Sequence, residues 1–205
     1  LMYYYTDVAG VPAAFVGTLF LVVRMIDAVS DPVMGMIVDN TRSRFGKFRP
    51  WIVLGTVVNS LALLALFSAH LFSGSQLLLF VTVTYIVWGL TYTIMDIPFW
   101  SMVPALSAHR EERERLVVWP RLFASIAWTV VGTYGLATIG VLGKGDDGKG
   151  FLLLCGLIII AFIASALVTI TQVKEQVPTQ TTSARFSFGD VISILRNNVQ
   201  LASLL

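Results

Sequence analysis

Charge and cysteine are both scarce in this sequence, and each scarcity argues against a class of protein. Asp, Glu, Lys and Arg make up 13% of the 205 residues, whereas about a quarter of an average soluble domain is charged. Because 56% of the residues are hydrophobic, the composition argues against a soluble globular domain and against a disordered chain. The single cysteine, Cys155, excludes an intramolecular disulfide and a multi-cysteine metal site. A net charge of +2 is too small to indicate a nucleic-acid partner.

Long apolar stretches fill most of the chain. The hydrocarbon core of a bilayer is about 30 Å thick and takes about 20 apolar residues as a helix. Stretches of this length occur at about 13–38, 50–71, 76–103, 119–142 and 151–173. The apolar segment 1–7 indicates the end of a further helix. We therefore predict an all-α polytopic membrane protein with about six spans, of which the first is partial. Short, turn-rich linkers predict that successive helices are antiparallel.

The chain divides by composition into three parts. We predict a transmembrane helix bundle at 1–173, a cytoplasmic middle loop at 174–187, and an interfacial helix with the start of a seventh span at 188–205. The last part rests on a helix-start pattern, Ser187-x-x-Asp190, followed by an apolar stripe. Both ends fall inside apolar runs and the first residue is not Met, so we expect a chain that is truncated at both ends.

Basic residues fall mainly in alternate linkers, which predicts the orientation in the membrane. Cytoplasmic loops carry an excess of Lys and Arg. The richer set of linkers is therefore expected in the cytoplasm, and the other set outside. The richer set contains Arg42, Arg44, Lys47, Arg49, Arg110, Arg113, Arg115, Lys174, Arg185 and Arg196, against Lys144 and Lys149 in the other.

Five charged residues fall inside the predicted spans: Arg24, Asp27, Asp31, Asp96 and Arg121. Each costs about 2.5–3.5 kcal/mol at the centre of a spanning helix, so unpaired they would cost roughly 12–18 kcal/mol together. They must therefore pair or face a water-filled cavity. Asp27 and Asp31 are spaced i, i+4 and share a helix face, with Arg24 one turn earlier on the same side.

Two prolines strengthen the case for a cation or proton site near these aspartates. Pro32 frees the carbonyl of Ala28, which lies between Asp27 and Asp31 in sequence, and Pro98 frees a carbonyl close to Thr93. Carboxylates, a hydroxyl and freed carbonyls are hard oxygen ligands, and proline-interrupted spans often mark transporter binding sites. The alternative interpretation is that Asp27 neutralises Arg24 and that both prolines are kinks.

A second constellation predicts a sugar site. Tyr92, Asp96 and Trp100 recur at i, i+4 and i+8 on one helix stripe, and Arg121 begins the following predicted span. A carboxylate and an arginine bind sugar hydroxyls, while an aromatic ring packs on the apolar face of a pyranose. Two alternatives remain open. The aromatic residues serve packing, or Asp96 and Arg121 form a structural ion pair without a ligand.

Four stretches of the sequence match a known family. They are 27–35 (DAVSDPVMG), 41–51 (TRSRFGKFRPW), 91–101 (TYTIMDIPFWS) and 119–125 (WPRLFAS). Together they resemble the glycoside-pentoside-hexuronide cation symporters, and within that family the melibiose carriers most closely. The resemblance covers essentially the whole chain and implies the amino-terminal six-helix half of a twelve-helix major-facilitator fold.

The resemblance also implies a cation site. Asp27, Asp31 and Thr93 match the family's ligands for an alkali cation, which is the one metal that we expect here. Ser30 lies beside them in sequence, where the melibiose carriers have an asparagine that bears on the choice of cation. This departure leaves coupling to sodium, lithium or proton open.

A sugar site is implied in the same way. Asp96, Trp100 and Arg121, with Tyr92 nearby, resemble the family's sugar contacts. The Lys-Asp pair of the family's first helix, which helps to bind sugar, is missing from this sequence, as are all carboxy-terminal residues.

Basic residues form a third predicted group. In relatives, similar residues form charge pairs between the two halves and close the cytoplasmic side. We therefore predict a gating or charge network that includes Arg24, Arg42, Arg49 and Arg113. The alternative is that the basic loops are a topology signal and nothing more.

These assignments predict secondary active symport of a glycoside, for example an α-galactoside such as melibiose, coupled to sodium, lithium or proton by alternating access. The alternatives are a proton-coupled pentoside or glucuronide transporter, a lipid transporter of the same superfamily, and a less favoured membrane-embedded enzyme. We expect no enzymatic activity, no catalytic residues, and no cofactor beyond the coupling ion. The expected partners are a small sugar, membrane lipid and the missing carboxy-terminal half, in a bacterial inner membrane.

Overall fold

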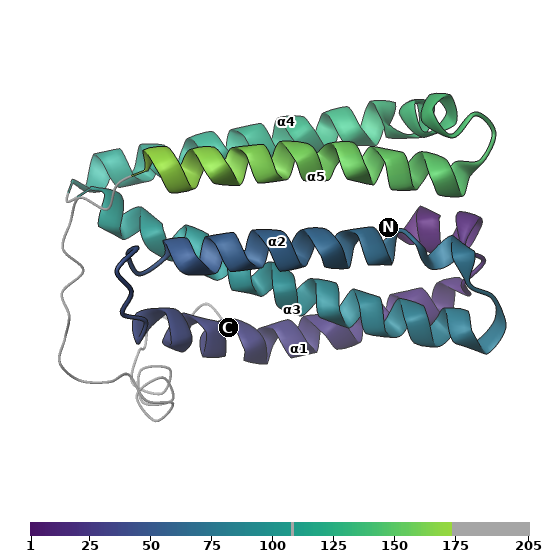
Figure 1. Ribbon diagram of the computed structural model, residues 1–205, viewed down its shortest axis with the longest axis horizontal. Helices are drawn as coiled ribbons and strands as arrows, with labels where there is room; N and C mark the ends of the chain where they lie inside the picture. The colour runs from purple at the N-terminus through teal and green to yellow at the C-terminus, as the bar shows by residue number, and fades with distance from the viewer. Residues whose placement is uncertain (108, 174–205) are drawn as a thin grey trace, which may run out of the picture.

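The computed structural model describes residues 1–107 and 109–173, and these form long helices without any strand. The helices run along one direction, and the turns between them gather at the two ends of the bundle (Figure 1). The predicted middle loop at 174–187, and the predicted interfacial helix with the start of a seventh span at 188–205, lie outside the described residues. The elements are η1 (Tyr4–Val8), α1 (Ala13–Asp39), α2 (Arg49–Leu66), η2 (Ala69–Leu71), α3 (Gly74–Leu106), α4 (Arg110–Gly143) and α5 (Asp147–Gln172).

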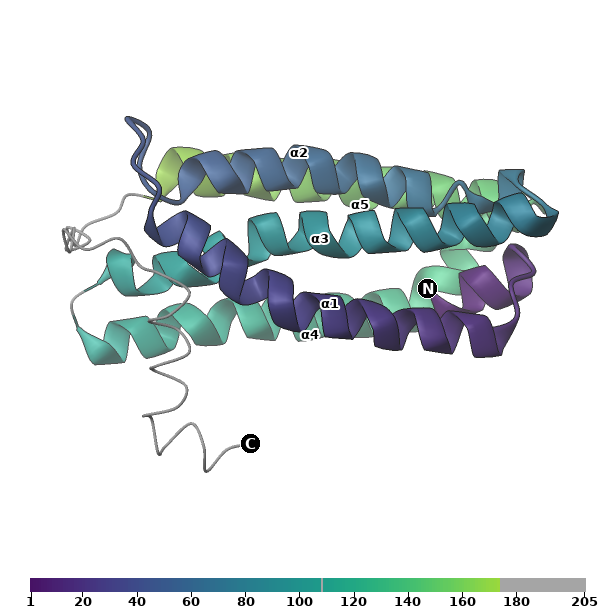
Figure 2. The same cartoon turned by 90° about the horizontal axis from the view of Figure 1, so that it is seen from below.

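The prediction of an all-α membrane fold is confirmed. Five helices, α1 to α5, are long and apolar enough to cross a membrane, and the short π-helix η1 stands where the partial span was expected. Pro32, Pro98 and Pro120 lie inside helices that continue past them. The prolines therefore do not break the spans into separate segments, although α1 is visibly curved along its length (Figure 2).

Two helices begin earlier than predicted. α4 begins at Arg110 rather than near residue 119, because its polar first turns are stabilised by local interactions. Arg110 Nε lies 2.9 Å from Glu114 Oε1 in an i, i+4 pair, and acidic residues in a first turn favour the helix dipole. α5 begins at Asp147 rather than near residue 151. The carboxylate of Asp146 accepts a hydrogen bond from the Lys149 backbone N–H at 3.0 Å, which caps this helix and lowers the pKa of Asp146.

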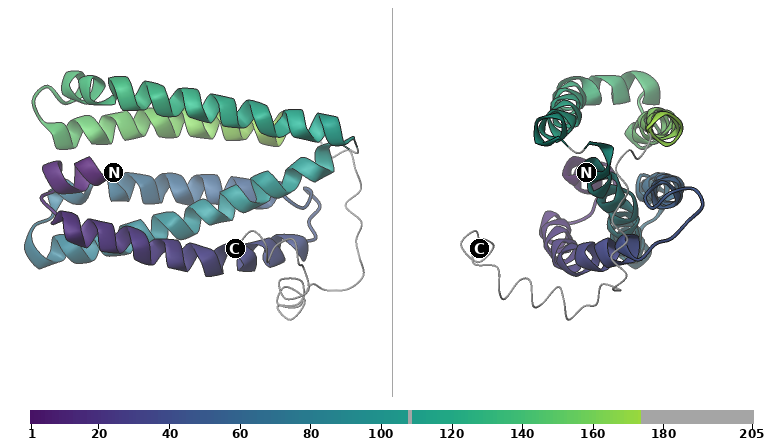
Figure 3. Two further views of the ribbon diagram at one scale, coloured as in Figure 1. Left: turned by 180° about the vertical axis from the view of Figure 1, so that it is seen from behind. Right: turned by 90° about the vertical axis from the view of Figure 1, so that its left-hand side faces the viewer.

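The helices pack as two groups. Viewed along the bundle, α4 and α5 lie side by side, and α1, α2 and α3 form the other group, with α3 in contact with both α1 and α2 (Figure 3). α2 also contacts α5, which joins the two groups.

Two apolar clusters occupy opposite ends of the three-helix group. α1 contributes Val16 and Val23 to one cluster, and Met34 and Val38 to the other. The middle of α1, between Val23 and Met34, contributes no residue to either cluster, and it carries the charged side chains of this helix apart from Asp39.

A glycine on α2 allows the close crossing of α2 and α3. A Cβ atom added at Gly55 would lie 2.7 Å from both the backbone nitrogen and the Cβ of Met95 on α3. Carbon atoms do not approach backbone atoms this closely, so a larger residue must push the two helices apart.

We expect Gly55→Ala to destabilise the protein by about 1–3 kcal/mol, the range for overpacking a well-packed core. Thermal unfolding of the purified protein in detergent would show this as a lowered midpoint. Gly17→Ala is the matched control, because Gly17 lies on α1 with no atom within 4 Å of an added Cβ. Alanine favours a helix over glycine, so the control should be neutral or slightly stabilising. Equal midpoints for the two variants would contradict the close crossing.

Candidate functional site

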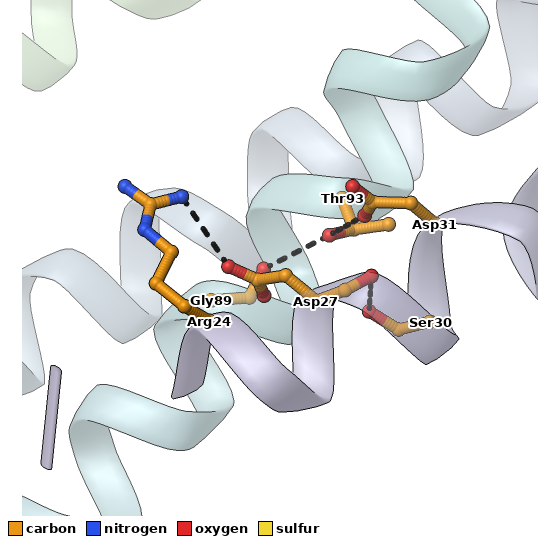
Figure 4. Close-up of polar contacts among 6 residues, drawn as sticks. All are labelled: Arg24, Asp27, Ser30, Asp31, Gly89 and Thr93. Carbon is orange, nitrogen blue, oxygen red and sulfur yellow. Dashed lines mark hydrogen bonds and ion pairs between the residues drawn. The ribbon is translucent and has the colours of Figure 1, made fainter. Parts of the chain in front are cut away.

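A polar layer separates the two apolar clusters, at the level where α1 crosses α3. Its carboxylates, Asp27 and Asp31, come from one face of α1, and Thr93 comes from α3 (Figure 4). Asn59 on α2 extends this layer, because its side-chain amide donates to Thr91 Oγ1 and to the Trp88 carbonyl on α3, both at 3.1 Å. Polar side chains from three helices are thus concentrated at mid-height in an otherwise apolar bundle.

The two carboxylate oxygens of Asp27 have different surroundings. Oδ2 lies 3.5 Å from Arg24 Nη1, and the Arg24 side chain is 84% exposed whereas that of Asp27 is 20% exposed. Oδ1 is buried and has no hydrogen-bond partner among the described residues. This oxygen faces α3, where an added Cβ at Gly89 would lie 3.6 Å from it. The long, partly exposed contact with Arg24 contributes little and does not engage Oδ1, so the ion pair alone leaves a buried acceptor unsatisfied.

The second carboxylate connects α1 to α3. Thr93 Oγ1 lies 3.0 Å from Asp31 Oδ1 and donates to it, and the same hydroxyl is 3.4 Å from the Gly89 carbonyl. Thr93 is 5% exposed. The predicted neighbours Asp27, Asp31 and Thr93 are therefore brought together.

Ser30 is placed differently from the other predicted ligands. Its Oγ lies 3.4 Å from the Asp27 backbone carbonyl and donates to its own helix. Figure 4 draws this hydroxyl apart from the Asp31–Thr93 contact. The structure therefore brings three of the four predicted cation ligands into one cluster, and directs the fourth to the backbone.

This cluster has the chemistry of a small-cation or proton site. Two carboxylates one helical turn apart, with a hydroxyl between helices, offer hard oxygen ligands and negative charge. In the part of the chain that the structure describes, no group of three or more His, Cys, Asp or Glu side chains could hold a metal ion.

The predicted sugar contacts lie next to this cluster, three of them on α3 and Arg121 on α4. Trp100 Nε1 donates to Asp96 Oδ1 at 3.1 Å, and the guanidinium carbon of Arg121 on α4 lies 5.8 Å from the centre of the Trp100 ring. Tyr92 lies one helical turn before Asp96 on the same face of α3. Asp96, Trp100 and Arg121 therefore form one connected group on α3 and α4, with Tyr92 on the adjoining turn. It combines carboxylate, guanidinium and hydroxyl groups with an aromatic ring.

An ion pair between Asp96 and Arg121 is not formed. Among the described residues, the ion pairs within 4.0 Å do not include this one. Arg121 instead lies against the Trp100 ring, and the Asp96 carboxylate accepts from Trp100. The two charges therefore do not satisfy one another, which leaves hydrogen-bonding capacity on both for a polar ligand.

The four arginines of the predicted charge network do not pair with one another, and two of them contact other groups of the chain. Arg49 Nη2 donates to the Val173 carbonyl at 2.6 Å and so ties the start of α2 to the end of α5. Arg24 contacts Asp27. Arg42 and Arg113 form no ion pair within the described part of the chain. A role for these residues between two halves of a transporter stays a prediction.

Sequence reasoning missed several residues that shape the site. Gly89 lets the Asp27 side chain approach α3 closely, and Asn59 adds an amide from α2 to the polar layer. Near the basic loop, Lys47 Nζ pairs with Asp39 Oδ1 at 2.8 Å. Asparagine is uncommon inside an apolar stretch, so the position of Asn59 in the sequence was a signal that could have been used. Nothing in the sequence pattern indicated which side chain Gly89 faces.

Comparison with known proteins points to one family. Residues 1–205 match the family model described as MFS/sugar transport protein. The inner membrane symporter YicJ of Escherichia coli (strain K12) is 33% identical over 195 residues, which cover 93% of this chain and 42% of that protein. The lactose permease of Lactobacillus helveticus is 36% identical over 169 residues, covering 77% of this chain and 26% of that protein. The isoprimeverose transporter of Lactiplantibacillus pentosus is 29% identical over 200 residues, covering 97% and 42% respectively. The chain thus spans less than half the length of these relatives.

Proposed function

The chain belongs to the MFS/sugar transport protein family, and we propose that it works in secondary active symport of a glycoside coupled to a small cation or a proton. The observation that carries this proposal is the presence of two neighbouring side-chain groups, one between α1 and α3 and the other between α3 and α4. The first group, at Asp27, Asp31 and Thr93, has a buried carboxylate oxygen that has no hydrogen-bond partner among the described residues. The other, around Asp96, has the groups that bind sugar hydroxyls.

Coupling follows from the short path between the two groups. Thr93 and Asp96 are three residues apart on α3, so a cation that changes the Asp31–Thr93 contact also changes the position of the sugar-binding carboxylate. A cation that raises the affinity for sugar must itself be bound more tightly when sugar is present, by the same factor. Alternating access would then rock this helical half against a second half.

The substrate class follows from the chemistry of the second group and from the relatives. A carboxylate, an arginine and a half-buried tryptophan suit a pyranose with several hydroxyls. Relatives named as a lactose permease and an isoprimeverose transporter support a glycoside substrate. We propose an α-galactoside such as melibiose, with sodium, lithium or proton as the coupling ion. Pentosides and glucuronides are the alternatives that a binding panel must include.

The proposal also includes the membrane in which the protein lies and the orientation of the helix bundle in it. Both basic loops, after α1 and before α4, lie at the same end of the bundle (Figure 1). The excess of Lys and Arg at that end supports a cytoplasmic location. We propose a bacterial inner membrane, in keeping with a relative named as an inner membrane symporter.

The test is binding of labelled sugars to the full-length protein in detergent, titrated against sodium, lithium and pH. We expect one glycoside to bind, with an affinity raised about 5- to 150-fold by the coupling ion, the usual range of coupling between two sites. The panel consists of an α-galactoside, a β-galactoside, a pentoside and a glucuronide, with a simple polyol as the control. Sugar binding that is independent of every ion and of pH would overturn coupling, while no binding of any sugar would overturn the substrate class.

A further inference from the structure

An apolar groove lies on the bundle between α2 and the end of α5, away from the polar layer. Its volume is about 540 Å³, and its lining includes Phe45, Arg49, Val53, Leu54, Val57 and Ile170. Val53, Leu54 and Val57 are 43%, 47% and 52% exposed, so the groove is open along α2. Its walls carry almost no polar atoms apart from the arginine, which excludes a sugar as the occupant.

One guanidinium group, that of Arg49, lines this groove, and a second, that of Arg44, lies over the ring of the lining residue Phe45. Arg49 begins α2 and uses one Nη2–H to bind the Val173 carbonyl, which leaves other donors of its planar fork available. The guanidinium carbon of Arg44, which does not itself line the groove, lies 4.7 Å from the centre of the Phe45 ring. Neither arginine has a carboxylate within 4.0 Å in the described part of the chain. The nearby Asp39 pairs with Lys47 instead.

We propose that this groove binds one anionic phospholipid, with its phosphate on Arg49 and Arg44 and an acyl chain along Val53, Leu54 and Val57. The charge pattern matches this occupant, because the cations stand at the end of α2 where the chain leaves the membrane and the apolar wall runs inward from them. Residues 49–57 span about 12 Å of helix, a length of hydrocarbon that one acyl chain can cover. Arginine binds phosphate oxygens in a bidentate manner, and basic pockets between spanning helices are typical sites for anionic headgroups.

The inference goes beyond the proposed transport function and does not depend on it. It requires that α2 and α5 face lipid at this groove, and it uses none of the residues around Asp27 or Asp96. A lipid here would bridge the start of α2 and the end of α5, next to the Arg49–Val173 contact that already joins them.

The experiment is a lipid titration of the full-length protein by native mass spectrometry. Phosphatidylglycerol is compared with phosphatidylcholine that carries the same acyl chains. Each basic residue near an anionic surface contributes about 5-fold in affinity, so we expect one phosphatidylglycerol to bind about 5- to 30-fold more tightly than phosphatidylcholine. Arg44→Gln should lower this preference about 5-fold. Arg49→Gln should do the same, but it also removes the Val173 contact, so Arg44→Gln is the cleaner variant.

Filling the groove tests the acyl-chain part of the proposal. Leu54→Trp places a large ring on the groove wall and should weaken the binding of both lipids at this site. Leu61→Trp is the matched control, because Leu61 lies on the same helix, is 63% exposed and does not line the groove. Arg115→Gln removes an arginine from the other basic loop and should leave the lipid preference unchanged.

Three outcomes would overturn the proposal. The first is equal binding of the two lipids by the unmodified protein. The second is an equal loss of preference in Arg44→Gln and Arg115→Gln, which would indicate a general electrostatic effect. The third is the same lipid affinity in Leu54→Trp and Leu61→Trp, which would mean that another segment of the protein covers the groove.

Discussion

Replacing Asp27 with Asn is expected to abolish the stimulation of sugar binding by the coupling ion. Asp27 Oδ1 is a buried carboxylate oxygen with no hydrogen-bond partner among the described residues, and Arg24 approaches the other oxygen no closer than 3.5 Å. A bound cation or proton would satisfy this oxygen, and an amide has no charge with which to hold the cation. An interaction with a charged group contributes about 1.5–3 kcal/mol, so cation affinity should fall about 10- to 150-fold.

The measurement is sodium and lithium binding by isothermal titration calorimetry, with and without sugar. Asp147→Asn serves as the control, because Asp147 is an exposed carboxylate in the first turn of α5, far from the polar layer in sequence. Asp31→Asn should resemble Asp27→Asn and should also loosen the contact with Thr93. Unchanged cation affinity in Asp27→Asn, in a variant that unfolds at the normal temperature, would remove this aspartate from the cation site.

Replacing Asp96 with Asn is expected to have a comparably large effect, but on the sugar. Asp96 accepts from Trp100 and forms no ion pair with Arg121 in the described structure. Its carboxylate therefore keeps free lone pairs for sugar hydroxyls. The asparagine keeps the size and one carbonyl oxygen, but it replaces a charged acceptor with a donor. The loss of two charge-assisted hydrogen bonds would lower sugar affinity about 100-fold or more.

The cation affinity of Asp96→Asn separates this effect from unfolding. Without sugar, this variant should still bind the coupling ion with near-normal affinity, because Asp27, Asp31 and Thr93 are intact. The two variants should therefore have opposite effects. Asp27→Asn should lose binding of the coupling ion, and Asp96→Asn should lose binding of the sugar. If Asp96→Asn kept normal sugar affinity, the group around Trp100 would be a packing feature of α3 and α4.

Part of the site was predictable because it depends on one helix at a time. Asp27 and Asp31 share a face of α1 since residues four apart do so on any α-helix. Tyr92, Asp96 and Trp100 align along α3 for the same reason. The contact of Trp100 with Asp96 is such an i, i+4 pair.

Other features were predicted less well because they depend on local stabilisation that competes with hydropathy. α4 extends outward to Arg110 and α5 begins at Asp147. In both cases the polar residues at the start of the helix were interpreted as part of a linker. An i, i+4 ion pair stabilises the first turns of α4, and a capping carboxylate stabilises the first turn of α5. The Asp96–Arg121 ion pair, which the sequence left open as an alternative, is not formed, and the Arg121 guanidinium carbon lies 5.8 Å from the centre of the Trp100 ring.

The sequence by itself determined the class of protein, the order of the five long helices that the structure describes, and the face of each helix that carries charge. These follow from hydropathy and from helical periodicity, which are properties of a single segment. The tertiary structure decided which segments meet. Thr93 reaches Asp31 across 62 residues of chain. Gly89 allows α3 to approach Asp27 so closely that one carboxylate oxygen is buried with no hydrogen-bond partner in the described part of the chain. Periodicity sets the direction of a side chain on its own helix, but the distance between two helices depends on side-chain volumes at their crossing, which no single segment contains.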